Sequence, residues 1–206
     1  QAAFEYGPID NAIYPMRQWR KSLAVAMDQI DAAKTRFYPK RSGTTALQTA
    51  LAHYLEINRG IHCRPQQIVI TCGIQHSMEI LANMFGNNKS LAIEEPGYDG
   101  TRKIFENHHY DILPIPVGED GITVEKLSSV KADLLFLTPS HQFPTGAILP
   151  IGKRIQVLNW AAKQGCYIIE DDYVNELRYQ TAPLPSLYAL DSTHCVIYAG
   201  TFAKSL

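Results

Sequence analysis

The stretch from Cys166 to Tyr173 reads CYIIEDDY, and a second stretch from Cys195 to Leu206 reads CVIYAGTFAKSL. In each stretch a short apolar run, rich in β-branched and aromatic residues, predicts a buried strand. Acidic side chains that begin at Glu170 follow the first run, and Lys204 follows the second. Open α/β sheets bind their ligands at the carboxyl ends of the strands. The two stretches therefore predict a crevice that receives carboxylates from one strand and a single lysine from the next.

One kind of chemistry suits a lysine that faces carboxylates. A lysine amine condenses with an aldehyde to form a Schiff base, and a carboxylate that keeps a pyridine nitrogen protonated makes the ring an electron sink. Lys204 could supply the amine, either Asp171 or Asp172 the carboxylate, and Tyr173 a hydrogen bond to a ring oxygen.

Two other interpretations concern the same residues. Asp171 and Asp172 are adjacent acids at a strand end, and such a pair could hold Mg²⁺. A phosphate-binding loop ending at Lys204 is excluded, because that motif needs glycine directly before its lysine and Ala203 stands there.

Composition restricts the class of protein. The 206 residues are enough for a domain with a substantial core, and 46% hydrophobic with 19% charged residues is an ordinary soluble composition. Nineteen basic and twenty acidic side chains give a net charge of −1, so this chain has no electrostatic case for binding nucleic acid. No apolar run is long enough for a membrane span, and no signal peptide opens the chain. We expect a cytoplasmic protein with reduced cysteines and no metal site.

The order of the predicted elements indicates the domain organisation. We expect an extended segment and an amphipathic helix in residues 1–37, and a large domain in residues 38–206 that is truncated at its C-terminus, because the chain stops two residues after Lys204. Thr44 or Thr45 is expected to cap a helix that closes at Gly60. Further strands are expected at 68–71, 90–93, 110–117, 132–137, 166–169 and 196–199, and further helices after Gly73 and at 102–108, 123–129 and 151–164.

This alternation of helices and strands predicts an α/β fold with three layers, in which helices cover both faces of a mostly parallel sheet. A glycine between a strand and a helix, as at Gly73, is the geometry that binds phosphate on free backbone N–H groups. A long polar loop at residues 138–146 follows another predicted strand. Most of these polar stretches lie at strand carboxyl ends, so we expect them to share one crevice.

Several motifs in this order carry a resemblance. They are TCGIQHSMEIL (71–81), EEPGYDG (94–100), TPSHQFPTG (138–146), EDDYVNELRY (170–179) and YAGTFAKSL (198–206). With them the chain resembles the fold-type I pyridoxal-phosphate enzymes, the aspartate-aminotransferase superfamily. It is most similar to the aminotransferase-like domain of MocR-type regulators in the GntR superfamily, and TPSHQFPTG and EDDY are also typical of the 2-aminoadipate-type aminotransferases.

The resemblance implies pyridoxal 5′-phosphate as the cofactor and gives individual residues their roles. Lys204 would form the internal aldimine and, in a transaminase, shuttle the α-proton as general base. Asp171 matches the carboxylate that pairs with the pyridine nitrogen, and Tyr173 matches the phenol near the ring oxygen. Tyr98 matches the aromatic side chain that stacks on the ring.

The resemblance extends to the cofactor phosphate. The backbone of Gly73, Ile74 and Gln75, together with Thr201, matches the phosphate cup of the family. This match supports the helix-start geometry noted above.

The resemblance also implies a homodimer. His141 and Gln142 lie on the loop beside the ring, while Tyr38 matches a tyrosine that reaches the phosphate of the other subunit, so the sites would lie at a subunit interface. Ala203 replaces a common serine before the lysine and removes one possible phosphate contact, whereas Phe143 replaces an asparagine in a way that MocR proteins share.

Three functions are compatible with these residues. The first is an effector-sensing domain that binds pyridoxal phosphate and an amino compound or amino acid, and that meets DNA only through a domain outside this chain. The alternative is a working aminotransferase that moves an amino group from an amino acid to a 2-oxo acid. The third is a cofactor-free dimerisation module, which the presence of Lys204, Asp171 and Tyr173 disfavours.

Overall fold

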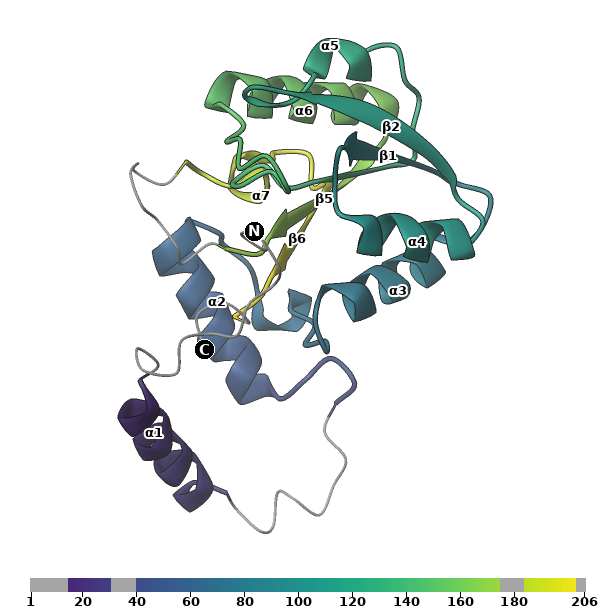
Figure 1. Cartoon of the computed structure of the whole chain (residues 1–206). Coiled ribbons are helices and arrows are strands. Elements are labelled where there is room, and N and C mark those ends of the chain that lie inside the picture. The colour runs from purple at the N-terminus through teal and green to yellow at the C-terminus, as the bar shows by residue number, and fades with distance from the viewer. Residues whose placement is uncertain (1–14, 31–39, 175–183, 203–206) are drawn as a thin grey trace, which may run out of the picture. The chain divides into compact units, whose positions relative to one another are not determined.

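The computed structural model describes residues 15–30, 40–174 and 184–202 (Figure 1). The chain divides into two compact units, Gln1–Arg41 and Ser42–Leu206. The described part of the first unit is mainly the helix α1 (Met16–Asp28), which begins after Pro15. The predicted boundary after residue 37 falls among the residues that the structure does not describe. Within the described ranges no helix is long and apolar enough to cross a membrane.

The second unit alternates helices and strands. Its helices are α2 (Thr45–Arg59), the 3₁₀ helix η2 (Pro65–Gln67), α3 (Ile74–Phe85), α4 (Asp99–Asn107), α5 (Val124–Leu127), α6 (Ile151–Gln164) and α7 (Leu187–Leu190). Its strands are β1 (Ser90–Glu95), β2 (Asp111–Gly118), β3 (Gly121–Ile122), β4 (Leu134–Leu137), β5 (Tyr167–Asp172) and β6 (Val196–Gly200).

The six strands form one sheet in the order β3-β2-β1-β4-β5-β6. Every neighbouring pair is parallel except β2 and β3, which form an antiparallel hairpin between Gly118 and Gly121. The predicted mostly parallel α/β sheet is therefore confirmed.

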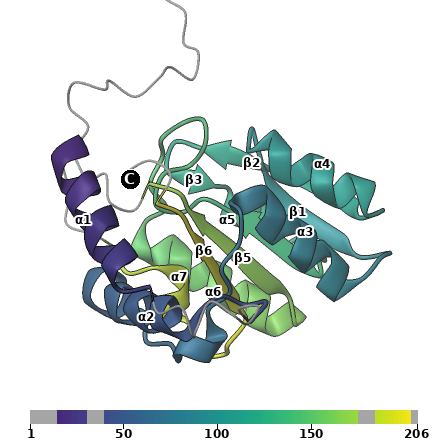
Figure 2. The ribbon, with the colours of Figure 1, turned by 90° about the horizontal axis from the view of Figure 1, so that it is seen from below.

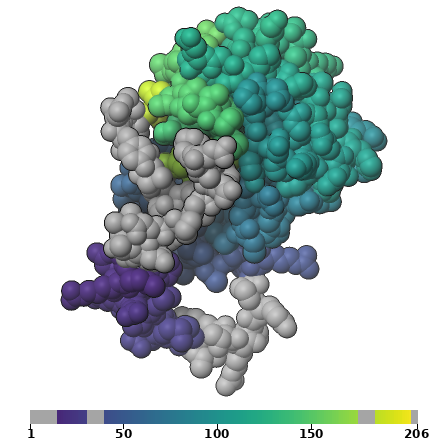
Figure 3. Space-filling view, in the orientation of Figure 1, coloured from purple at the N-terminus to yellow at the C-terminus, as the bar shows by residue number. Residues whose placement is uncertain are grey.

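Helices cover both faces of this sheet, as two separate core clusters show. One cluster joins the sheet to α5, α6 and α7, and it includes Leu135, Ile168 and Val196. The other joins the sheet to α3 and α4, and it includes Phe136 and Ile169. Figure 2 shows α3 and α4 on one side of the strands and α6 on the other, and in the space-filling view of Figure 3 the teal and green residues of this unit form one continuous surface. The three-layer prediction is confirmed.

Local sequence signals set the ends of α2 as predicted. Thr44 is the N-cap, and its side-chain oxygen accepts a hydrogen bond from the N–H of Leu47 at 3.4 Å. Gly60 ends the helix in the left-handed conformation at φ 64°. Both signals act within one helical turn, which is why the sequence alone suffices for them.

The predicted strand at residues 68–71 is wrong. Its backbone forms hydrogen bonds with α2 and the loop before α2 instead of with a strand. The N–H of Ile70 donates to the Ser42 carbonyl at 2.9 Å, and the Gln48 amide donates to the Ile68 carbonyl at 2.7 Å. No strand of the described sheet pairs with the segment, because the sheet ends at β6. An apolar, β-rich run becomes a strand only if a partner lies beside it, and periodicity does not show whether one does.

Substitution of Gly43 tests how closely residues 68–71 pack against the loop before α2. Gly43 lies at φ 110°, a region that favours glycine, and a Cβ atom there would collide with the Ile70 side chain. We expect Gly43→Ala to lower the free energy of unfolding by about 1–3 kcal/mol, measured by urea denaturation. Gly152→Ala is the control, since nothing lies near a Cβ at that helical position, and it should be neutral or slightly stabilising. If both substitutions lowered the free energy of unfolding equally, the positive φ of Gly43 and its close contact with Ile70 would not be the cause of the destabilisation.

Candidate functional site

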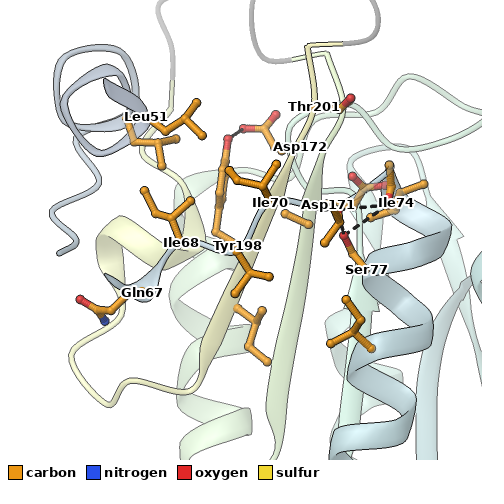
Figure 4. A pocket seen from close by; sticks show the side chains of 18 of the residues that line it. Leu51, Gln67, Ile68, Ile70, Ile74, Ser77, Asp171, Asp172, Tyr198 and Thr201 are labelled. Atoms are coloured by element: carbon orange, nitrogen blue, oxygen red, sulfur yellow. Dashed lines mark hydrogen bonds between the residues drawn. The ribbon is translucent and has the colours of Figure 1, made fainter. Parts of the chain in front are cut away.

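A pocket of about 560 Å³ opens beside the carboxyl ends of β5 and β6 (Figure 4). Apolar side chains of α2, α3 and residues 68–70 form most of its wall. Its more polar part contains Thr71, Gly73, Ser77, Asp171, Asp172, Tyr198 and Thr201. The volume lies in the range of small-molecule sites, which also combine an apolar wall with a few polar groups.

The pleat of β5 separates the three consecutive acids. Successive side chains of a strand point to opposite faces, so Glu170 and Asp172 share the face of Ile168, whereas Asp171 shares the face of Ile169 and α3. Figure 4 shows Asp172 beside Tyr198, and Asp171 on the side of Ile74 and Ser77. The two aspartates therefore cannot chelate one Mg²⁺ ion together. In the described part of the chain no group of three or more His, Cys, Asp or Glu side chains could hold a metal ion.

Asp171 is the acid of this site that has neither an ion pair nor a hydrogen-bond donor among the described residues. The residue is buried, with a relative exposure of 6%. Burial, followed by the negative charges of Asp172 and Glu94, raises the pKa of Asp171 to about 7. A cationic N–H donor brought by a ligand would satisfy this carboxylate, as a protonated pyridine nitrogen does.

Glu170 has a structural role instead. Its two carboxylate oxygens accept hydrogen bonds from the N–H groups of Leu187 and Tyr188, at 2.9 and 3.0 Å. These two N–H groups begin α7, so the acid caps a short helix that the sequence did not predict. Burial nevertheless raises the pKa of Glu170 to about 7.

The start of α3 offers backbone donors to an anion. Gly73 is its N-cap at φ 96°, and having no side chain it does not cap the N–H groups of Ile74 and Gln75. Thr71 and Ser77 hydroxyls lie 2.8 Å apart at the same helix end. This combination of unfilled N–H groups, hydroxyls and the positive end of a helix fits a phosphate.

The end of β1 and the loop after it are hydrogen-bonded to the loop that follows β4. Glu94 accepts hydrogen bonds from the N–H and the hydroxyl of Thr138, at 3.0 and 2.7 Å. The Gln142 amide donates to the Pro96 carbonyl at 2.9 Å. Burial raises the pKa of Glu94 to about 7, against the lowering effect of these donors. Glu94 is a residue that sequence reasoning missed, although its place at a strand end was a usable signal.

The predicted ring contacts lie on these loops rather than on the pocket wall. Tyr98 receives a hydrogen bond from the Gln75 amide at 3.2 Å and meets Phe143 edge to face, with ring centroids 6.2 Å apart. Gln142 is fully buried and uses its amide within the loops, and His141 lies beside it. The described residues that line the pocket include none of Tyr98, His141 and Gln142.

The remaining predicted residues are placed only in part. The structure brings Gly73, Ile74, Asp171 and Thr201 to one pocket. Tyr173 directly follows β5 and is half-buried. Two predicted residues, Tyr38 and Lys204, lie outside the described residues.

The chain matches a known protein family and is similar to individual proteins of known sequence and structure. Residues 9–206 match the family of aminotransferases class I and II. The chain is 44% identical, over 98% of its length, to an uncharacterised HTH-type transcriptional regulator YdeL of Bacillus subtilis, and 36% identical, over 80%, to a probable rhizopine catabolism regulatory protein MocR of Rhizobium meliloti. The crystal structure of LysN, an α-aminoadipate aminotransferase of Thermus thermophilus in complex with N-(5′-phosphopyridoxyl)-L-leucine, superposes with a TM-score of 0.83 at 27% identity, over 95% of this chain.

The chain covers only part of the length of each of these proteins. The chain spans 44% of the Bacillus protein, 34% of the Rhizobium protein and 51% of the LysN chain. It therefore corresponds to about half or less of each.

The pH dependence of stability tests the environment of Asp171. A folded-state pKa of about 7 lies above the unfolded value of 3.8, so between these pH values the folded state binds more protons than the unfolded state. The free energy of unfolding should therefore fall as pH rises from about 4 to about 7. We expect Asp171→Asn to reduce this fall by up to about 4 kcal/mol, measured by urea denaturation at several pH values.

Asp133 is the matched control. Burial tends to raise its pKa, but hydrogen bonds from Ser90 and Lys89 lower it overall. Its contribution should be lost as pH falls, so Asp133→Asn should change the pH profile in the opposite sense. A profile that Asp171→Asn leaves unchanged would contradict the raised pKa of Asp171.

Proposed function

Since the chain belongs to the family of class I and II aminotransferases, we propose that it binds pyridoxal 5′-phosphate in the pocket beside β5. We propose further that it is the aminotransferase-like domain of a MocR-type transcriptional regulator and senses an amino compound or amino acid. The observation that carries the proposal is the buried Asp171 carboxyl group, which no described residue satisfies, beside the uncapped start of α3.

The residues of the pocket fit the parts of this cofactor. Asp171 would accept a hydrogen bond from the ring nitrogen and hold the proton there, because a carboxylate in a low-dielectric site favours a positive partner. The N–H groups of Ile74 and Gln75, with Thr201, would bind the phosphate. Lys204 would supply the amine and Tyr173 a hydrogen bond to the ring oxygen. When bound, the cofactor supplies an electron sink for a substrate amine.

Regulation rather than turnover is favoured by the relatives. A regulator and a probable regulator match this chain at 44% and 36% identity. In this proposal DNA is contacted only by a domain outside the chain. The protein would act in the cytoplasm as a homodimer, with Tyr38 reaching the phosphate of the other subunit.

An active aminotransferase is the second candidate, and the likeness to LysN favours it. A transamination assay of the full-length protein with amino acids and 2-oxo acids separates the two candidates. Turnover would support the enzyme, whereas amino-acid binding without turnover would support the sensor.

Lys204 gives the direct test of cofactor binding. We expect the purified protein to show a visible absorbance band with pyridoxal phosphate, and borohydride should fix the cofactor covalently at Lys204, located by peptide mapping. Lys204→Ala should abolish both the band and the adduct, because no other amine is proposed for the site. Lys153→Ala is the control, since that lysine is paired with Asp120 at 2.6 Å and should leave the band intact. An adduct on another lysine, or a band that persists without Lys204, would refute the assignment.

A further inference from the structure

Arg59, the last residue of α2, is a buried cation next to the proposed cofactor site. Its side chain is 4% exposed and forms an ion pair with the carboxylate of Asp172, whose side chain is fully buried. Burial is the largest single effect and lowers the pKa of Arg59, but Asp172, Tyr198 and Glu170 together more than offset it, so the pKa is raised. The pair therefore consists of two charges that have left water and depend on each other.

Other elements meet at this pair. The hydroxyl of Tyr198 on β6 donates to the same Asp172 oxygen at 2.9 Å, and a guanidinium nitrogen of Arg59 donates to the Ser140 hydroxyl at 3.3 Å. Arg59 thereby connects α2 with β5, β6 and the loop that follows β4. The other oxygen of Asp172 and the Nε of Arg59 are buried and have no partner among the described residues.

A second buried arginine, Arg154, also feels the charges of Glu170 and Asp172, but its hydrogen bonds go to other groups. Arg154 on α6 donates to the carbonyls of Leu149, Pro139 and Pro185, at 2.8 to 2.9 Å. These acceptors are neutral, and they join loops within the core. Arg59 instead neutralises an acid that directly precedes Tyr173 and directly follows Asp171 in β5.

We propose that Arg59 is a positioning residue for the cofactor: by holding Asp172 as an ion pair on one face of β5, it weakens the repulsion between Asp172 and Asp171, so that Asp171 on the other face can ionise beside the ring nitrogen. This inference rests on the proposed function. Without Arg59, Asp172 would be a buried, unpaired carboxylate next to Asp171, and two adjacent anions oppose each other's ionisation. Asp171 would then hold its own proton more often and accept the ring N–H⁺ less well.

The test is the dissociation constant of pyridoxal phosphate in the protein at its natural length, from titrations followed by absorbance. We expect Arg59→Met to weaken binding by roughly 10–100-fold, the range found at metal sites when the partner of a ligating side chain is removed. Asp172→Asn should leave binding equal or tighter, because the remaining charge of Arg59 favours the anionic form of Asp171. The double variant should recover most of the affinity that Arg59→Met loses, since no unpaired buried carboxylate remains.

Thermal melting of the cofactor-free variants separates electrostatics from packing. Both single substitutions leave a buried charge alone and should lower Tm, but only Arg59→Met should weaken binding. Lys153→Met, which removes one partner of a more exposed ion pair, should change neither. If Arg59→Met does not fold, Asp172→Asn alone still decides the matter: a weaker affinity in that variant overturns the inference.

Three further outcomes are decisive. An unchanged affinity in Arg59→Met, or a double variant that binds no better than Arg59→Met, shows that Arg59 does not position Asp171 and leaves the proposed function intact. Failure of the unaltered protein to bind pyridoxal phosphate overturns the proposed function, and this inference falls with it.

Discussion

The pleat of β5 is the constraint on which the site depends. Neighbouring side chains of a strand point to opposite faces. Three consecutive acids therefore meet different surroundings. Glu170 caps α7, Asp172 pairs with Arg59, and Asp171 faces the pocket without a donor among the described residues. A shift of one residue in the register of β5 would exchange these faces. The pairing of β5 with β4 and β6 on either side prevents such a shift.

Burial then changes the acidity of the Asp171 carboxyl group. In a wetter site Asp171 would be an ordinary ionised carboxylate, whereas here burial and the neighbouring charges of Asp172 and Glu94 raise its pKa to about 7. The surrounding loops are held by hydrogen bonds that involve no ligand, such as those from Thr138 to Glu94. The site is therefore largely formed in advance, and a cationic ligand would supply what the carboxyl group lacks.

Predictions from the sequence succeeded where the determining contacts are local. Thr44 and Gly60 bound α2 through hydrogen bonds and backbone conformations within a single turn. The prediction at residues 68–71 failed, because strand formation needs a partner that lies far away in the sequence. Arg59 stands directly before the Gly60 that ends α2, and nothing else in the sequence around it indicates a further role. Its role depends on Asp172, more than a hundred residues further along the chain, and no spacing rule predicts that contact.

The sequence by itself determined the alternation of elements, the mostly parallel sheet and the family, because hydrophobic periodicity and motifs are properties of short segments. It also placed Asp171 at a strand carboxyl end, whereas the strand that it predicted before α3 does not form. Only the tertiary structure decided which of two adjacent aspartates lacks a partner. It also decided that the Gln142 amide binds the Pro96 carbonyl and that Arg59 neutralises Asp172. Charge pairing and burial depend on what lies across the fold, since Coulomb interactions and desolvation act through space and not along the chain.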